Sequence, residues 1–177
     1  MDLQQNYFQL FGLSEAFELD SEALTDRYRS LQRSLHPDRF ANAPDQERRI
    51  ALQQAAQVNS GYETLRDPLG RARYLLTLRG DEYCDETSTI NDLEFLEQQM
   101  ELRENLAEIR FSDDVHIALS AFMDELAMKN NSYIEKLREA FSVEAVDASH
   151  VKGLVQRMQF MRKLQQEAES LEEELLF

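Results

Sequence analysis

Near the start of the chain a histidine and a carboxylate stand two residues apart, in His36-Pro37-Asp38. A histidine beside a carboxylate could serve as a general acid or base. The other histidines, His116 and His150, are distant in sequence and have no Cys or His nearby, so neither a metal site nor a hydrolytic triad gains support. The chain also lacks a glycine-rich phosphate loop and a nucleophile elbow. We therefore expect that the chain is not an enzyme and binds neither a metal nor a cofactor. The alternatives for His36-Pro37-Asp38 are an intrinsic active site and a plain structural role in a hairpin turn.

Two amphipathic stretches, 21–35 and 45–65, flank this tripeptide. Asp20 is a good N-cap for the first stretch. Pro37 disfavours helical geometry at His36, which predicts a loop between two helices. Apolar residues recur at helical spacing on one face of each helix, whereas Arg29 and Arg33 project from the opposite face of the first. The predicted core positions are Leu24, Tyr28, Leu31 and Leu35 in one helix, and Ala51, Ala55, Val58, Tyr62 and Leu65 in the other.

Two shorter helices accompany this pair. One covers 6–13 and is closed by Gly12, and it is too short to be stable unless it packs on its neighbours. Asp67-Pro68 ends the long helix at 45–65, and a further short helix is predicted at 71–79, with Tyr74, Leu75 and Leu78 as its apolar residues.

Charge is distributed unevenly between the two halves of the chain. The net charge is −15, but residues 1–80 hold 10 Lys or Arg against 11 Asp or Glu, and residues 81–177 hold 9 against 23. An acidic surface repels phosphate backbones, so a basic protein patch is a better partner than nucleic acid. No apolar run is long enough to cross a bilayer, no signal peptide is recognisable, and the single Cys84 cannot form an internal disulfide. We expect a cytoplasmic protein that binds no membrane.

A polar, acidic stretch at 80–88 interrupts the helical pattern, with Gly80 as a candidate residue after a helix end. No alternating strand pattern is sustained, so the fold class is all-α. We predict a domain at 1–79, a linker at 80–88 and a three-helix bundle at 89–177. Its helices are expected at 91–110, from Ser112 and Asp113 through the stripe Val115, Leu119, Phe122, Leu126, Tyr133 and Leu137, and along the stripe Leu154, Met158, Met161, Leu164, Ala168, Leu171 and Leu175.

The helix at 91–110 has one apolar face more than a bundle requires. Phe95, Leu102, Leu106 and Ile109 gather within about 60° on one side, enough to seal the core. Leu93, Leu96 and Met100 gather almost opposite, beside acids at 4-3-4 spacing, namely Glu97, Glu101, Glu104 and Glu108. An apolar strip rimmed by like charge is typical of a protein-binding surface. The alternative is that this second face, Leu93 in particular, packs against the first domain.

Two helices joined by a loop with His-Pro-Asp resemble a J-domain, the module that stimulates ATP hydrolysis by Hsp70 chaperones. The resemblance narrows to the HscB (Hsc20-type) co-chaperones of iron–sulfur cluster assembly and covers nearly the whole chain. It rests on the segments 7–13, 31–40, 59–68 and 71–76, and on 95–104 and 171–176 in the second half. The chain lacks the paired CxxC motifs that some members carry in an N-terminal extension.

The resemblance implies two partners and two sets of site residues. An HscA-type Hsp70 would be bound by His36, Pro37, Asp38, Arg27, Arg29, Arg33 and Arg39. An IscU-type scaffold protein would be bound by Leu96, Glu97, Met100, Glu101, Glu104, Glu108 and Phe160. Glu97 departs from the family pattern, since a close relative has methionine at this position. The chain would then deliver the scaffold to the Hsp70 and stimulate the ATPase of that chaperone.

Two other functions are compatible with the sequence. The J-domain could be fused to an adaptor that recruits a client unrelated to iron–sulfur clusters. A purely structural helical protein is the other possibility, and the absence of any effect on an Hsp70 ATPase would favour it.

Overall fold

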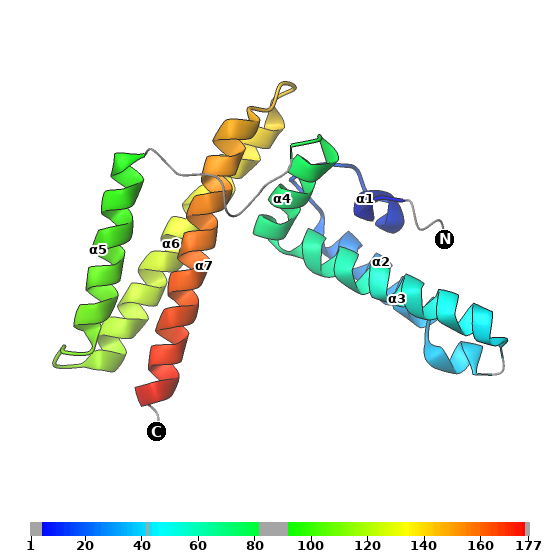
Figure 1. Ribbon diagram of the computed structural model, residues 1–177, viewed down its shortest axis with the longest axis horizontal. Helices are drawn as coiled ribbons and strands as arrows, with labels where there is room; N and C mark the ends of the chain where they lie inside the picture. The colour runs from blue at the N-terminus through cyan, green and yellow to red at the C-terminus, as the bar shows by residue number, and fades with distance from the viewer. Residues whose placement is uncertain (1–4, 42, 82–91, 176–177) are drawn as a thin grey trace. The chain divides into compact units, whose positions relative to one another are not determined.

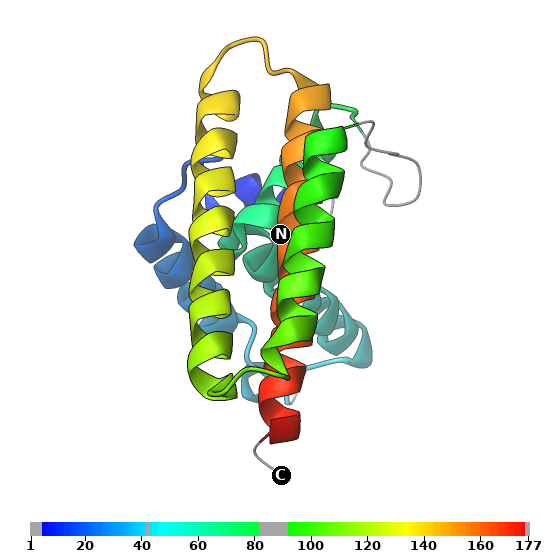
Figure 2. The same ribbon diagram turned by 90° about the vertical axis from the view of Figure 1, so that its left-hand side faces the viewer.

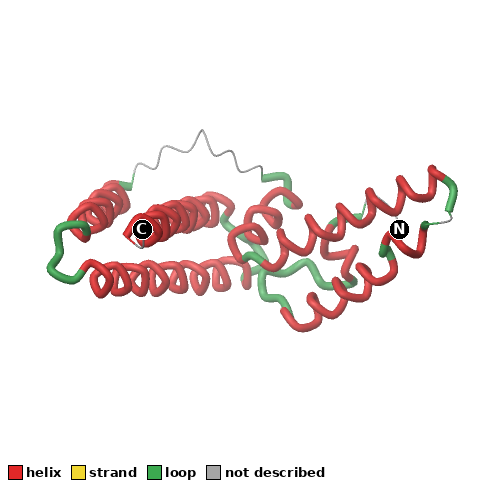
Figure 3. Tube along the Cα trace, turned by 90° about the horizontal axis from the view of Figure 1, so that it is seen from below, coloured by secondary structure: helices red, strands yellow, loops and turns green. Residues whose placement is uncertain are grey.

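The computed structural model describes residues 5–41, 43–81 and 92–175, and every regular element in these ranges is a helix (Figure 3). The predicted all-α class is therefore confirmed. The chain divides into two compact units, Met1–Gly80 and Asp81–Phe177. Most of the predicted linker at 80–88 lies outside the described residues. No helix in the described ranges is both long enough and apolar enough to span a membrane.

The first unit is built on a helical hairpin (Figure 1). Helices α2 (Ser21–Ser34) and α3 (Asp45–Arg66) pack on each other, and the 3-10 helix η1 (Pro37–Phe40) lies in the connection between them. Helices α1 (Tyr7–Phe11) and α4 (Pro68–Leu78) both pack on α3. The hairpin thus places the His-Pro-Asp tripeptide at its turn.

Local capping explains where the first two helices begin and end. The Asn6 side chain accepts a hydrogen bond from the Gln9 N–H, and Gly12 closes α1 in the left-handed region with φ of 64°. This conformation favours glycine because a Cβ would crowd the backbone. The Asp20 carboxylate accepts hydrogen bonds from the N–H groups of Glu22 and Ala23 at the start of α2. The predicted closing role of Gly12 and the predicted N-cap are both confirmed.

The core of the first unit joins α1 to the hairpin and to α4. A Cβ added at Gly61 of α3 would come within 2.9 Å of the Tyr7 ring, so glycine permits close packing there. The Tyr74 hydroxyl accepts a hydrogen bond from the Tyr7 N–H at 2.9 Å, and the two rings stack. Burial raises the pKa of Tyr74. The largest fully buried side chains are Phe8, Phe11, Leu24, Val58, Leu65 and Leu76.

Helix α4 starts three residues earlier than the sequence predicted. Pro68 is its first residue, a position where proline loses no hydrogen bond, and the Asp67 carboxylate accepts from the Gly70 N–H. Asp67-Pro68 does end α3 as predicted, since Asp67 is the C-cap of that helix, but Pro68, Leu69 and Gly70 already belong to α4. Leu78 is exposed rather than part of the core. Gly80 follows the helix with φ of 82°, as predicted.

The second unit is a bundle of α5 (Leu93–Ile109), α6 (Val115–Ser142) and α7 (Ala148–Leu175) (Figure 2). All three pairs of helices are in contact. The predicted core stripes are buried at nearly every described position, although Val115 is only half-buried. The core consists of Phe95, Leu102, Leu106, Ile109, Leu119, Phe122, Leu126, Tyr133, Leu137, Val151, Leu154, Val155, Met158, Met161, Leu164, Ala168 and Leu171, with Phe160 beside Phe95.

The start of α6 differs from the prediction. Asp114 is the N-cap, and its carboxylate accepts a hydrogen bond from the Ile117 N–H. The predicted capping residue Ser112 instead donates its hydroxyl to the Ile109 carbonyl at the end of α5. Ser112 therefore completes the preceding helix, because serine hydroxyls can serve the carbonyls of a helix end as readily as the N–H groups of a helix start.

Candidate functional site

The His-Pro-Asp tripeptide forms a capped turn. Helix α2 ends at Ser34, and His36 has an extended conformation that the following Pro37 favours. The His36 Nδ1 accepts a hydrogen bond from the Asp38 N–H at 3.3 Å, so the imidazole is the N-cap of η1. This hydrogen bond therefore holds the backbone of Asp38 in place relative to His36.

Both side chains of the turn face open surface. The His36 Nδ1 lies 3.5 Å from the Asp38 Oδ2, with 59% of the His36 side chain and 90% of the Asp38 side chain exposed. Water weakens the electrostatic interaction between groups as exposed as these two. Both side chains are accessible for contact with another molecule. Within the described ranges, no group of three or more His, Cys, Asp and Glu side chains could hold a metal ion.

Helix α2 brings arginines next to this turn. An open groove of about 710 Å³ is lined by Arg29, Arg33 and His36, together with Asp26 and Gln32. The Arg33 Nε donates to the Arg29 carbonyl at 3.3 Å, and an Arg29 guanidinium nitrogen lies 3.9 Å from the Asp26 carboxylate. Three predicted Hsp70-binding residues are thus collected on one face.

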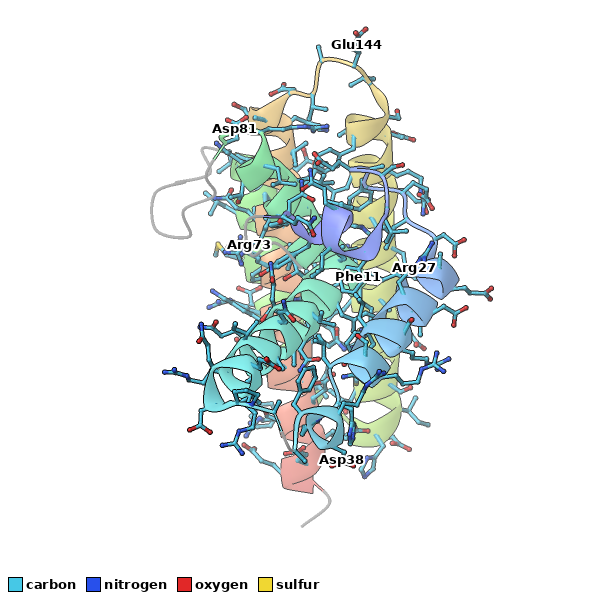
Figure 4. The ribbon with its side chains drawn as sticks, turned by 90° about the vertical axis from the view of Figure 1, so that its right-hand side faces the viewer. Phe11, Arg27, Asp38, Arg73, Asp81 and Glu144 are labelled. Atoms are coloured by element: carbon cyan, nitrogen blue, oxygen red, sulfur yellow. The ribbon has the colours of Figure 1, made fainter. Side chains whose placement is uncertain are left out.

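The remaining predicted residues of this group do not line the groove. Pro37, Asp38 and Arg39 lie just beyond it in η1, and all three are exposed. Arg27 is exposed on α2 (Figure 4), and because it lies two residues before Arg29 it projects about 200° away from Arg29 around the helix. Arg27 would therefore reach only the margin of a partner seated in the groove.

Polar and aromatic contacts, which sequence reasoning missed, hold α2 against α3. The rings of Tyr28 and Tyr62 stack with centroids 3.9 Å apart, and the Tyr28 hydroxyl donates to the Asn59 side chain. A hydrogen bond with Thr25 lowers the pKa of Tyr62, and the Arg66 guanidinium nearby acts in the same direction. These contacts hold α2, the helix that carries the arginines, against α3. The only sequence signal for these contacts is the helical spacing of Tyr28 and Tyr62. That spacing predicts two core positions and does not predict the hydrogen bonds or the ring stacking.

The second candidate surface is the outer face of α5. We define the apolar strip as Leu93, Leu96 and Met100, whose exposed fractions are 70%, 45% and 64%. The opposite face of the helix carries the buried residues Phe95, Leu102, Leu106 and Ile109. The prediction that α5 has a second, surplus apolar face is confirmed.

Acidic side chains border the apolar strip. We define the glutamate row as Glu97, Glu101, Glu104 and Glu108, all of which are exposed. None of the four carboxylates has a hydrogen bond or an ion pair with the part of the chain that the structure describes. Glu97 and Glu101 also line an open groove of about 490 Å³ toward α6 and α7. The row is therefore available to neutralise positive charge on another molecule.

Phe160 of α7, the remaining predicted scaffold-binding residue, is buried. Only 7% of it is exposed, its ring meets Phe95 edge to face at 5.8 Å between centroids, and the Arg103 guanidinium lies 5.8 Å from its ring centre. Phe160 thus lies against the inner face of α5, with almost no free surface of its own. Its helical position at the edge of the α7 core stripe could not show which way the ring turns.

Two further contacts, absent from the sequence interpretation, fix α5 on the bundle. Arg157 of α7 forms a hydrogen-bonded ion pair with Asp92, which is also the N-cap of α5, and its guanidinium lies over the Phe95 ring at 4.9 Å. The Tyr133 hydroxyl donates to the Gln98 side chain at 3.1 Å, and burial raises the pKa of Tyr133. The first turns of α5 are therefore held firmly, which keeps the apolar strip in place.

Comparison with known proteins gives consistent matches along the chain. Residues 91–169 match a family model described as the HSCB C-terminal oligomerisation domain. The chain is 42% identical over 172 residues to a co-chaperone protein HscB homolog of Shewanella baltica (strain OS223), covering 97% of this chain and 99% of the relative. The HscB homolog of Shewanella loihica (strain ATCC BAA-1088 / PV-4) is 44% identical over 171 residues, covering 96% and 99%.

Solved structures give the same answer. The chaperone HscB from Vibrio cholerae has a TM-score of 0.84 at 39% identity, and the match covers 97% of this chain and 99% of that one. Human co-chaperone protein HscB has a TM-score of 0.88 at 28% identity, covering 97% of this chain and 84% of the human one. The similarity therefore extends over both units.

Proposed function

The chain belongs to the HscB co-chaperone family, and we propose that it acts in iron–sulfur cluster assembly by binding an IscU-type scaffold protein and delivering it to an HscA-type Hsp70. The observation that carries the proposal is the combination of a His-Pro-Asp turn beside an arginine groove in one unit with an exposed apolar strip in the other. One surface suits a chaperone and the other suits a client.

The turn supports the Hsp70 side of the proposal. Arg29 and Arg33 offer guanidinium groups that match carboxylates in geometry and charge. In this arrangement they dock on an acidic surface of the chaperone, with Arg39 beyond the turn and Arg27 at the margin. His36, Pro37 and Asp38 then bias the chaperone toward its hydrolysing conformation. The chain itself performs no bond chemistry and changes the rate of another enzyme.

The apolar strip supports the scaffold side. Fully burying a leucine or methionine stabilises a complex by roughly 1.5 to 3 kcal/mol, so the three residues of the strip supply the energy of a moderate complex. The glutamate row contributes orientation and rate of encounter, because rim charges steer partners more than they add affinity. Phe160 contributes from below, by holding Phe95 and hence the strip in place.

Delivery follows from joining the two surfaces in one chain. A scaffold held by α5 and an Hsp70 held by the hairpin experience each other at a high effective concentration. The domains that we assign are the J-domain at 1–79, the linker at 80–88 and the scaffold-binding bundle at 89–177. The cytoplasm, which contains the machinery of such a reaction, is the proposed location.

The test is a steady-state ATPase assay with a purified HscA-type Hsp70. We expect the full chain to raise the ATPase rate, an IscU-type scaffold to raise it weakly, and the two together to exceed the sum of their separate effects. Stimulation by the chain without any further effect of the scaffold would instead favour an adaptor for another client. No stimulation at all would contradict the assignment of the turn.

A further inference from the structure

The apolar strip of α5 has acidic residues on one border only. On a 3.6-residue wheel, Arg103 lies about 60° from Met100, on the side away from Glu104. Arg110 falls on the same side as Arg103, two turns further along the helix. The exposed surface of α5 therefore changes from negative through apolar to positive around the helix.

The positive border continues into a groove between two helices. An open groove of about 610 Å³ is lined by Arg103 of α5, by Arg110 at the C-cap of α5 and by Lys163 of α7. Leu106 and Leu171, both buried, form its apolar floor. Figure 2 shows α5 in front of α7. The residues that line the groove come from these two helices and from the end of α5.

Two of the three cations in the groove have no anionic partner within the described residues. Arg110 donates to the Glu174 carboxylate at 3.0 Å. The Arg103 guanidinium lies over the ring of Phe160 and forms no ion pair in those ranges, and the Lys163 side chain has neither a hydrogen bond nor an ion pair there. Glu167 also lines the groove without pairing with either of them. These unpaired cations are unusual in a half of the chain that holds 9 Lys or Arg against 23 Asp or Glu.

We propose that this groove is the second half of the scaffold-binding surface and that it takes an acidic segment of the partner that covers the apolar strip. Arg103 borders the apolar strip and also lines the groove, so the two surfaces are continuous. The positive charge of the groove attracts an anionic segment, which the rest of this acidic unit would repel. Opposite charges on the two borders permit one orientation of the partner, because the reversed orientation would place like charges together. This inference rests on the proposed function, and it adds the chemistry of the partner surface.

The test compares charge reversals by calorimetry, with the full chain and an IscU-type scaffold. Lys163→Glu removes a side chain with no partner in the described residues, so it should leave the fold intact. Arg138→Glu on α6 gives the same change in net charge away from the groove and is the matched control. We expect Lys163→Glu to weaken scaffold binding about ten-fold and the control to stay within about two-fold. The difference should shrink as salt is added.

A second pair of variants makes the result independent of folding. Arg103→Lys keeps the positive charge and should bind as the unchanged chain does, whereas Arg103→Glu should bind at least about ten-fold more weakly. Equal effects of Lys163→Glu and Arg138→Glu would overturn the groove assignment while leaving the proposed function in place. The groove assignment would also be overturned if Lys163→Glu bound the scaffold as the unchanged chain does but self-associated less in sedimentation. That result would mean that the groove binds a second copy of the chain. Failure of the unchanged chain to bind the scaffold would overturn the proposed function itself.

Discussion

The two units expose their candidate binding residues in different ways. In the hairpin unit the exposed groups are polar, and a turn fixes them, with the His36 Nδ1 accepting from the Asp38 N–H. In the bundle the exposed groups are apolar, and a straight helix fixes them, with Leu93, Leu96 and Met100 on its outer face. A polar turn depends on local hydrogen bonds and tolerates no change of side-chain geometry. An apolar strip depends on summed area and weakens gradually when it is trimmed.

The largest expected effect belongs to the turn. His36→Gln removes the ring nitrogen that caps η1, and with it the fixed position of Asp38, so we expect stimulation of the Hsp70 ATPase to be abolished. Scaffold binding, which depends on the other unit, should remain unchanged. The measurement is the ATPase rate together with calorimetry of scaffold binding. His116→Gln, an exposed histidine on α6, is the matched control and should behave as the unchanged chain does. If His36→Gln stimulated the Hsp70 ATPase normally, the turn would tolerate a change of side chain, and the proposed difference between the turn and the apolar strip would be wrong.

The next effect concerns the support beneath the strip. Phe160→Ala should lower the free energy of unfolding by about 3 to 5 kcal/mol, because it opens a cavity beside Phe95. Denaturant unfolding measures this loss, and exposed Phe111→Ala should change stability by less than about 0.5 kcal/mol. A stable Phe160→Ala variant with poor scaffold binding would show instead that the ring itself contacts the partner.

The smallest expected effect comes from trimming the strip. Leu96→Ala with Met100→Ala should reduce scaffold affinity by roughly 3 kcal/mol, which corresponds to about 100-fold, with little change in stability. Calorimetry and thermal unfolding check the two parts. The matched control is Ile117→Ala with Met128→Ala, two exposed apolar residues of α6. Equal losses in both double variants would mean that α5 has no special role.

Much of the fold could be predicted because its signals are local. Asp20, Gly12 and Gly80 mark helix ends through their own backbone chemistry, and the structure confirms each of them. Errors arose where one residue type can serve either of two neighbouring helices. Asp67-Pro68 ends α3 as predicted but also starts α4, which the sequence places only at 71, and Ser112, predicted at the start of α6, completes α5.

The candidate surfaces divide in the same manner. The surplus face of α5 was visible because helical periodicity places Leu96 and Met100 away from Phe95 whatever the helix packs on. The burial of Phe160 was not visible, since a residue at the edge of a stripe turns inward or outward according to its neighbours on another helix. Neither was the Arg157–Asp92 pair, whose members are 65 residues apart.

By itself the sequence determined the helices, the His-Pro-Asp turn and the existence of an extra apolar face, because each follows from residues within one or two helical turns. Only the tertiary structure decided that Phe160 supports α5 from beneath and that Arg103 and Lys163 line one groove. These arrangements join α5 to α7, and contacts between helices depend on side-chain packing across the bundle, which no local pattern encodes.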